Sequence, residues 1–548
     1  MTHDFTRRAF IGLGAAAVGS GVLAACAGGG SPRPRASGTS GPRTGGEIVY
    51  LNAMVNPGYQ QQQIGSWHAL QYWALFVEYL FYVNEKSELL PHLATGFTAN
   101  SDFTKFSIGI RTGVTFSNGE VLNADAVAKN LDLFGLGDTK RAIPRVANLP
   151  QSYQRAVAVD EYEVEVSLRD PFPAFIRHLA GSSTTAILAP ATIALPLAEQ
   201  SDLSNTHATG PWTVQSWTPS KEVILQRRDD YAWPRLDAKH SGPAYLDKIT
   251  IQQLTEDELR VGALESGQAQ IIHYPQPSAE VGLAKKGFHV IDAFGPGSVW
   301  GLHIRITAPH VDDLRVRQAL TRAVDRQQIV DTLYPPNWKV AQGPLNRATP
   351  WGIDLYEKFS YDPDLANRLL DEAGWTGRDE DGYRTRDGQT LELLEYPSVF
   401  ITTSKSDLTL IAQQWQKVGI KLTLKNVDYD NYNTVTAPNL EPPPPLYEIH
   451  WGAAYPTFLW RWWDTGQQDQ FDAPPGGRMD QLLTQITAAQ TDQEAYALAA
   501  RLQEFVIDNA YFIPVHEFPQ NFAAAGNLQG ITYDGYPRIQ LYDAWLDA

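Results

Sequence analysis

The chain of 548 residues contains a single cysteine, Cys26. A lone cysteine excludes an intrachain disulfide, so the fold must be stabilised by large hydrophobic cores, which a chain of this length can supply. The twelve histidines are scattered, and no two of them have the close spacing of a zinc site. The sequence therefore predicts a protein without a metal site or a cofactor.

Catalytic motifs are also missing. The chain has no G-x-S-x-G nucleophile turn, no G-x-x-x-x-G-K-S/T phosphate-binding loop and no H-E-x-x-H metal-binding helix. Its 61 acidic residues leave room for a catalytic carboxylate pair, but most of them are expected to be solvated surface groups. These absences favour a binding protein over an enzyme.

Positive charge is scarce. Lysine and arginine total 44 against 61 acidic residues, which gives a formal net charge of −17. Because phosphate groups are bound by lysine and arginine, such a chain is a poor binder of nucleic acid and does not adhere to anionic lipid by charge. After residue 25, no apolar run is long enough to span a bilayer.

The N-terminal 25 residues have the order of a secretory signal. Arg7 and Arg8 match a twin-arginine export signal and precede an apolar run over 9–25, which ends in small residues before Cys26. This order resembles a bacterial lipoprotein signal, so we predict a signal peptide over 1–25 and a lipid on Cys26 that anchors the exported protein to the outer face of the cytoplasmic membrane. An ordinary signal with an incidental buried cysteine is the alternative. A spanning helix fits less well, because the run is short and rich in glycine and alanine.

The mature chain is expected to begin with a tether. Residues 26–46 combine the anchor cysteine with a stretch dominated by Gly, Ser, Pro and Thr, which is typical of a flexible linker. The 523 residues that remain after the signal are too many for one ordinary core, so two or three domains are expected. Contents of 43% hydrophobic and 19% charged residues are typical of a soluble globular protein.

Helices and strands are mixed along the folded part. Residues 48–51 form a short apolar stretch and residues 161–168 alternate between polar and apolar, so both are predicted to be strands. Residues 312–330 and 362–373 each place their apolar side chains on one helical face and are predicted to be helices.

A βαβ unit is predicted further along. Two Asp-Gly pairs between 381 and 388 indicate hairpin turns; a calcium loop is the alternative, but its alternating acidic spacing is absent. A strand at 391–396, a helix at 406–418 and a strand at 420–424 then follow. Since ligands of open α/β sheets bind beyond the carboxyl ends of the strands, we expect the loop at 397–405 to face a cleft.

Several ordered segments resemble the family 5 solute-binding proteins of ABC importers, the dipeptide, oligopeptide and nickel group. The matching stretches are 89–94 (LLPHLA), 106–120 (FSIGIRTGVTFSNGE), 208–212 (ATGPW), 245–249 (YLDKI), 263–267 (ALESG), 313–320 (DLRVRQAL) and 370–375 (LDEAGW). Each stretch is weak alone. Their joint order over the chain carries the resemblance.

The resemblance implies an α/β fold: a two-lobed periplasmic-binding-protein-like clamp with an additional domain, three domains in all. The implied boundaries are 47–88, 207–305 and 512–548 for a discontinuous domain I, 89–206 for domain II, and 306–511 for domain III. The ligand is then enclosed between domains I and III when the lobes close. Because the ligand contacts both lobes only in the closed form, binding favours closure.

One departure from the family bears on the ligand. Peptide-binding members carry an aspartate in a G-W-x-x-D-Y stretch, and this aspartate pairs with the ligand's α-ammonium. Here the matching stretch is 448–455 (EIHWGAAY), with Ala454 in the place of the aspartate. No acidic residue lies between His450 and Trp463. Since burying an ammonium without its partner costs on the order of several kcal/mol, we expect weak binding of unmodified di- to pentapeptides and a modified or non-peptide ligand.

Aromatic residues are dense in the same region, where they offer stacking surfaces for rings, sugars or cations. Some of them are equally expected to be core residues. The predicted ligand-binding residues are Tyr396, Phe400, Trp451, Ala454, Tyr455 and Trp460 in domain III, with Asn56, Tyr59 and Trp300 in domain I.

The resemblance thus implies a monomeric extracytoplasmic lipoprotein. It captures a small organic solute and delivers it to the membrane permease of an ABC importer. The expected partners are the solute and the permease, with no nucleic acid and no membrane contact except the lipid. An enzyme or a sensory binding protein built on the same clamp is the alternative. A titrating group in the cleft would favour the enzyme, and the absence of neighbouring permease genes would favour the sensor.

Overall fold

A computed structural model describes residues 41–63, 66–180, 184–437 and 440–547. The predicted signal peptide and Cys26 lie outside this part of the chain. From Pro42 onward the described residues form one compact unit. None of its helices is both long and apolar enough to cross a membrane.

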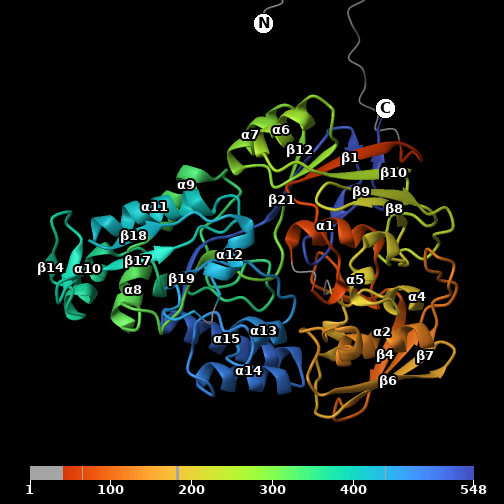
Figure 1. The fold of residues 1–548 in the computed structure, drawn as a ribbon, viewed down its shortest axis with the longest axis horizontal. Coiled ribbons are helices and arrows are strands. Elements are labelled where there is room, and N and C mark those ends of the chain that lie inside the picture. The colour runs from red at the N-terminus through yellow and green to blue at the C-terminus, as the bar shows by residue number, and fades with distance from the viewer. Residues whose placement is uncertain (1–40, 64–65, 181–183, 438–439, 548) are drawn as a thin grey trace, which may run out of the picture. The chain divides into compact units, whose positions relative to one another are not determined.

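The largest sheet has seven strands, in the order β12-β21-β11-β1-β10-β9-β8 (Figure 1). Its central strand is β1 (Glu47–Asn52), which confirms the strand predicted at 48–51 and runs parallel to both of its neighbours. The other strands are β8 (Trp212–Thr218), β9 (Glu222–Arg227), β10 (Lys248–Gln253), β11 (Ile271–His273), β12 (His289–Ala293) and β21 (Gln520–Ala524). Segments far apart in the sequence therefore build one sheet, with helix α1 (Trp67–Phe76) beside it.

A four-stranded antiparallel sheet is built from residues 94–168. Its order is β4 (Ala94–Ala99), β5 (Lys105–Ile110), β7 (Glu163–Leu168) and β6 (Tyr153–Asp160), and helix α2 (Ala124–Leu136) packs on it. The strand predicted at 161–168 is β7, which begins after a turn at 161–162.

The predicted βαβ unit is confirmed. Strand β17 (Glu392–Glu395) pairs in parallel with β18 (Lys421–Leu424), and α11 (Ser404–Lys417) connects them. The helix predicted at 362–373 is α10 (Pro363–Glu372). The single helix predicted over 312–330 is wrong: the segment forms α8 (Leu314–Arg322) and α9 (Arg326–Leu333). The break occurs because the Asp325 carboxylate accepts from the backbone N–H of Gln328 and starts a new helix.

Two antiparallel strands run between these parts of the fold. They are β13 (Trp300–Ile304) and β20 (Phe512–His516), with the short β19 (Leu446–Tyr447) on the other side of β13. Just before β13, Gly297 forms a bridge with Gly452. A side chain at Gly297 would lie 2.2 Å from the backbone oxygen of Trp451, so only glycine allows the two backbones to approach so closely.

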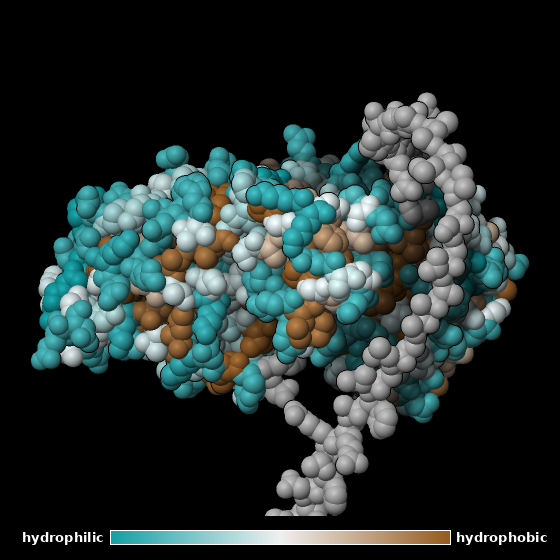
Figure 2. Space-filling model, turned by 90° about the horizontal axis from the view of Figure 1, so that it is seen from above, coloured by the Kyte–Doolittle hydropathy of each residue, from teal (hydrophilic) through white to brown (hydrophobic). Residues whose placement is uncertain are grey.

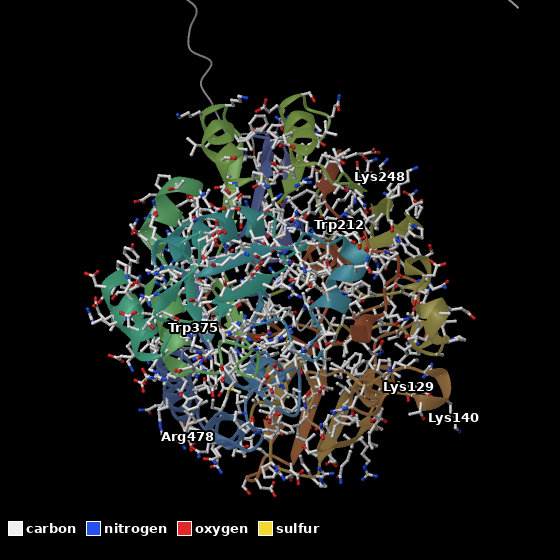
Figure 3. All side chains as sticks on the ribbon, turned by 60° about the vertical axis from the view of Figure 1, so that its left-hand side comes forward. Lys129, Lys140, Trp212, Lys248, Trp375 and Arg478 are labelled. Carbon is white, nitrogen blue, oxygen red and sulfur yellow. The ribbon has the colours of Figure 1, made fainter. Side chains whose placement is uncertain are left out.

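The hydrophobic interior is divided among several clusters. Trp212 lies in the cluster beneath the seven-stranded sheet and Trp375 in the cluster around the βαβ unit, far apart on the ribbon (Figure 3). Lys129, Lys140, Lys248 and Arg478 lie at the periphery in the same view. The face seen in Figure 2 is mainly hydrophilic, with hydrophobic residues between the polar ones.

Candidate functional site

A cavity of about 370 Å³ opens between the seven-stranded-sheet part and the part that holds the βαβ unit. One wall comes from Asn56, from the start of α1, and from Tyr274 and Phe518. The other comes from the loop after β17, helix α12 (Tyr429–Val435) and the segment from Tyr447 to His450. Seven aromatic side chains line it: Trp67, Tyr274, Phe400, Tyr432, Tyr447, Trp462 and Phe518.

The wall near α1 offers polar groups without partners. Asn56 Oδ1 and Ser66 Oγ are buried and form no hydrogen bond within the described chain. His68 is fixed by a hydrogen bond of 2.8 Å between its Nδ1 and Asn52 Oδ1. Burial lowers the pKa of His68 to about 4, with a further contribution from Arg260, so its ring is neutral at neutral pH. This wall can therefore orient a ligand by hydrogen bonds but carries no charge of its own.

The opposite wall contains a buried carboxylate, Glu448, which is 2% exposed. Its Oε1 accepts from the backbone N–H of Ser398 at 3.1 Å and from the hydroxyl of Ser404 at 2.6 Å. Its Oε2 accepts from the indole N–H of Trp300 at 3.0 Å. The Glu448 side chain is thereby hydrogen-bonded to three separate segments: β13, the loop after β17 and the start of α11.

Two more carboxylates lie behind Glu448. Burial raises the pKa of Glu448 to about 7, and the negative charge of Asp407 adds to this effect. Burial and the charge of Glu448 also raise the pKa of Glu395 well above its usual range. Asp407 is itself fixed, since it accepts from the hydroxyl of Tyr334 at 2.6 Å. Burial therefore favours the protonated form of Glu395, and this wall disfavours additional negative charge.

His450 sits between the two walls. Its ring centroid lies 6.1 Å from that of Trp67 and 4.8 Å from that of Phe518. Burial lowers the pKa of His450 to about 4, so this ring is also neutral at neutral pH. The two lining histidines thus serve as aromatic surface rather than as cations.

The structure brings some predicted site residues to the cavity. Asn56 and Phe400 line it, and the loop at 397–405 faces it as expected, through Ser398, Phe400 and Ile401. Trp300 lies behind the wall, 1% exposed, and reaches the site only through Glu448. Tyr396 is half-buried and does not line the cavity.

Other predicted residues lie elsewhere. Tyr59 is 1% exposed and stacks on Trp73 in the core beneath the large sheet. Trp451 and Ala454 are buried in the hydrophobic cluster that reaches the four-stranded sheet, and the half-buried Trp460 packs against it. The hydroxyl of Tyr455 donates to Asp492 Oδ1 at 2.9 Å. In this structure none of these five residues lines the cavity.

Sequence reasoning missed Glu448. Glu448 lies two residues before the stretch from His450 to Trp463, which contains no acidic residue. Its signal is a single acid in the otherwise apolar and aromatic run LYEIHW. The lining residues Trp67, Tyr274 and Phe518 were missed too, because aromatic residues in apolar stretches are also typical of a core.

We expect Trp462 and Trp451 to respond differently to replacement by alanine. Trp462 lines the cavity, whereas Trp451 is 2% exposed and stacks behind it at 5.8 Å between ring centroids. Trp462→Ala should weaken ligand binding by about 2 kcal/mol with little change in stability. Trp451→Ala should lower the free energy of unfolding by about 3–5 kcal/mol. Melting temperature and dissociation constant measured together check both, and the reverse pattern would contradict this placement.

Comparisons with known proteins agree with the fold. The family model described as "Bacterial extracellular solute-binding proteins, family 5 Middle" matches residues 88–470. Glutathione-binding proteins GsiB of Pectobacterium atrosepticum and Salmonella choleraesuis are 27% and 28% identical over 356 and 354 residues. In each case the match covers 64% of this chain and spans 64% of the length of the relative.

Solved structures share the architecture. NikA from Brucella suis in complex with Fe(III)-EDTA has a TM-score of 0.77 at 22% identity. AppA from Bacillus subtilis in complex with a nonapeptide has a TM-score of 0.74 at 18% identity. Each match covers 92% of this chain and all of the other. The fold is thus the predicted α/β two-lobed clamp, and the chain belongs to family 5 of the bacterial extracellular solute-binding proteins.

Proposed function

We propose that the protein is the extracytoplasmic capture component of an ABC importer and that it acts as a monomer. It encloses a small organic solute between its two lobes and delivers this solute to a membrane permease. The observation that carries this proposal is the cavity of about 370 Å³ whose walls come from both sides of the connecting strands. A ligand that touches both walls stabilises the closed form, and that form is the one we expect the permease to bind.

The cavity differs from what a glutathione-like ligand requires. Glutathione carries two carboxylates and one ammonium, so a site for it needs cations. The polar lining here consists of amides, hydroxyls, two neutral histidines and the carboxylate of Glu448. A ligand carboxylate buried against this lining would stay unpaired, which is costly. The proposed solute is therefore neither glutathione nor an unmodified short peptide.

Contacts away from the cavity support closure. The His178 ring stacks on Phe458 at 4.2 Å between centroids, and its Nε2 lies 2.7 Å from the hydroxyl oxygen of Thr457. Nearby, Arg177 donates to Asp492 Oδ2 at 2.7 Å and lies over the ring of Tyr455. These pairs join the predicted domain II to the predicted domain III. In the proposed clamp they stabilise the closed form without touching the ligand.

Small-angle scattering tests closure. Protein stripped of ligand by unfolding and refolding should show a smaller radius of gyration after addition of a small-molecule extract of its native host. Arg177→Ala removes the ion pair and the cation–π contact between the predicted domains II and III, so this variant should need more ligand for the same change. Lys129→Ala is the control, because Lys129 pairs with Asp125 within α2. An unchanged radius at saturating ligand would contradict the clamp mechanism.

We also propose that lipid on Cys26 holds the protein at the outer face of the cytoplasmic membrane. The support is the order of basic, apolar and small residues before Cys26. A single acyl chain binds membranes only marginally, so at least two chains should be attached. Cys26→Ala should leave unprocessed or released protein, as seen by fractionation and intact mass. A variant that stays membrane-bound at the processed wild-type mass would refute the anchor.

A further inference from the structure

We infer that the cavity selects an organic cation that carries no carboxylate, with its positive group held beside Glu448 among aromatic rings. The inference rests on the proposed function, because it takes this cavity as the ligand site. It extends that function by naming the chemical class of the solute.

The first step concerns the free acceptor capacity of Glu448. An ionised carboxylate has about four lone-pair sites on its two oxygens. Within the described chain, Oε1 accepts two hydrogen bonds and Oε2 accepts one. All three donors are neutral groups, so none of them compensates the charge. Glu448 lines the cavity with an open position on Oε2, and because its pKa is raised to about 7, a ligand cation placed beside it would favour its ionised form.

The second step concerns the charges behind this wall. The negative charge of Asp407 acts on Glu448, and that of Glu448 acts on Glu395, so the three carboxyl groups form one interacting group. One nearby cation is Arg305, whose guanidinium donates to the backbone oxygens of Thr436 and Ala437 and offsets Glu395 in part. Burial and mutual repulsion favour the protonated form of Glu395, so this wall disfavours further negative charge; His516 Nε2 also lies 3.5 Å from Asp407 Oδ1. A ligand cation placed here is attracted, whereas a ligand carboxylate is repelled.

The third step concerns the rings. Phe400 and Tyr432 meet edge to face at 5.6 Å between centroids, and both line the cavity. Tyr447 holds the Arg305 guanidinium 5.0 Å from its ring centroid, so one of the lining rings already takes part in a cation–π contact. Aromatic rings with a nearby carboxylate form the arrangement that recognises organic ammonium groups. Among the described lining residues there is no lysine or arginine to pair with a carboxylate.

A neutral ring or sugar is the competing ligand, since aromatic walls also stack on uncharged solutes. The two classes differ in what Glu448 contributes. An uncharged ligand gains at most one hydrogen bond from the open position on Oε2. A cation also gains a charge interaction with the ionised form of Glu448, which its own presence favours.

Three soluble probes separate these possibilities in calorimetry on the stripped full-length protein. Tyramine is a cation without a carboxylate, tyrosol replaces the ammonium with a hydroxyl, and tyrosine adds a carboxylate. We expect tyramine to bind about tenfold or more tightly than tyrosol, and tyrosine to bind no better than tyrosol. Because this comparison uses only the wild-type chain, it does not depend on whether a variant folds.

Glu448→Gln tests the residue itself. It removes the charge and keeps an acceptor for Ser398 and Ser404, although its NH2 group no longer accepts from the Trp300 indole. Tyramine should lose about tenfold more affinity than tyrosol, because the lost Trp300 hydrogen bond affects both probes alike. Glu504→Gln is the matched control, because Glu504 is exposed on α15 (Asp492–Asp508), away from the cavity lining, and should leave both affinities unchanged. The melting temperature of each variant shows that the compared proteins are folded.

The outcomes are distinct. Equal binding of tyramine and tyrosol overturns the inference, as does binding of none of the three probes. Tyrosine binding as tightly as tyramine overturns its carboxylate-free part. In each of these cases the proposed function stands if the host extract still reduces the radius of gyration. If neither probes nor extract change the radius, both fail.

Discussion

The buried carboxylate of Glu448 is the constraint on which the site depends. A buried carboxyl group must be hydrogen-bonded, because it has lost its contacts with water. Glu448 accepts hydrogen bonds from β13, from the loop after β17 and from the first turn of α11. Hydrogen bonds to a charged group are worth about 1.5–3 kcal/mol each. Satisfying Glu448 therefore fixes the position of the loop that carries Phe400, and with it one wall of the cavity.

The other wall is built on a different principle. It brings Asn56 and the start of α1 against Tyr274 and Phe518, which belong to segments more than 200 residues away in the chain. Its histidine is neutral because burial opposes protonation, so the wall adds hydrogen-bonding groups and ring faces without charge. One wall has an ionisable carboxyl group and the other has no charged group, so the cavity is asymmetric, and this asymmetry is the basis for the inferred placement of the ligand's positive group beside Glu448.

Local patterns in the sequence predicted the parts of the fold that local forces determine. The βαβ unit, the loop at 397–405 and helix α10 follow from periodicity and capping, and the order of family stretches gave the two-lobed clamp. The break between α8 and α9 was missed, because the apolar face continues across Asp325 while the cap starts a new helix. Of the predicted ligand-binding residues, Asn56 and Phe400 line the cavity. Whether an aromatic residue such as Trp451 or Tyr59 lines a cavity or a core depends on long-range packing, which periodicity does not encode.

The solute that the protein carries in its native host is the most direct test of whether this cavity takes an organic cation without a carboxylate. The protein should be purified from its native host without denaturation, and the small molecule released on unfolding identified by high-resolution mass spectrometry and its charge by electrophoresis. We expect one molecule per chain, positively charged at neutral pH and lacking a carboxyl group. A peptide, glutathione or another carboxylate-bearing solute at the same stoichiometry would contradict it.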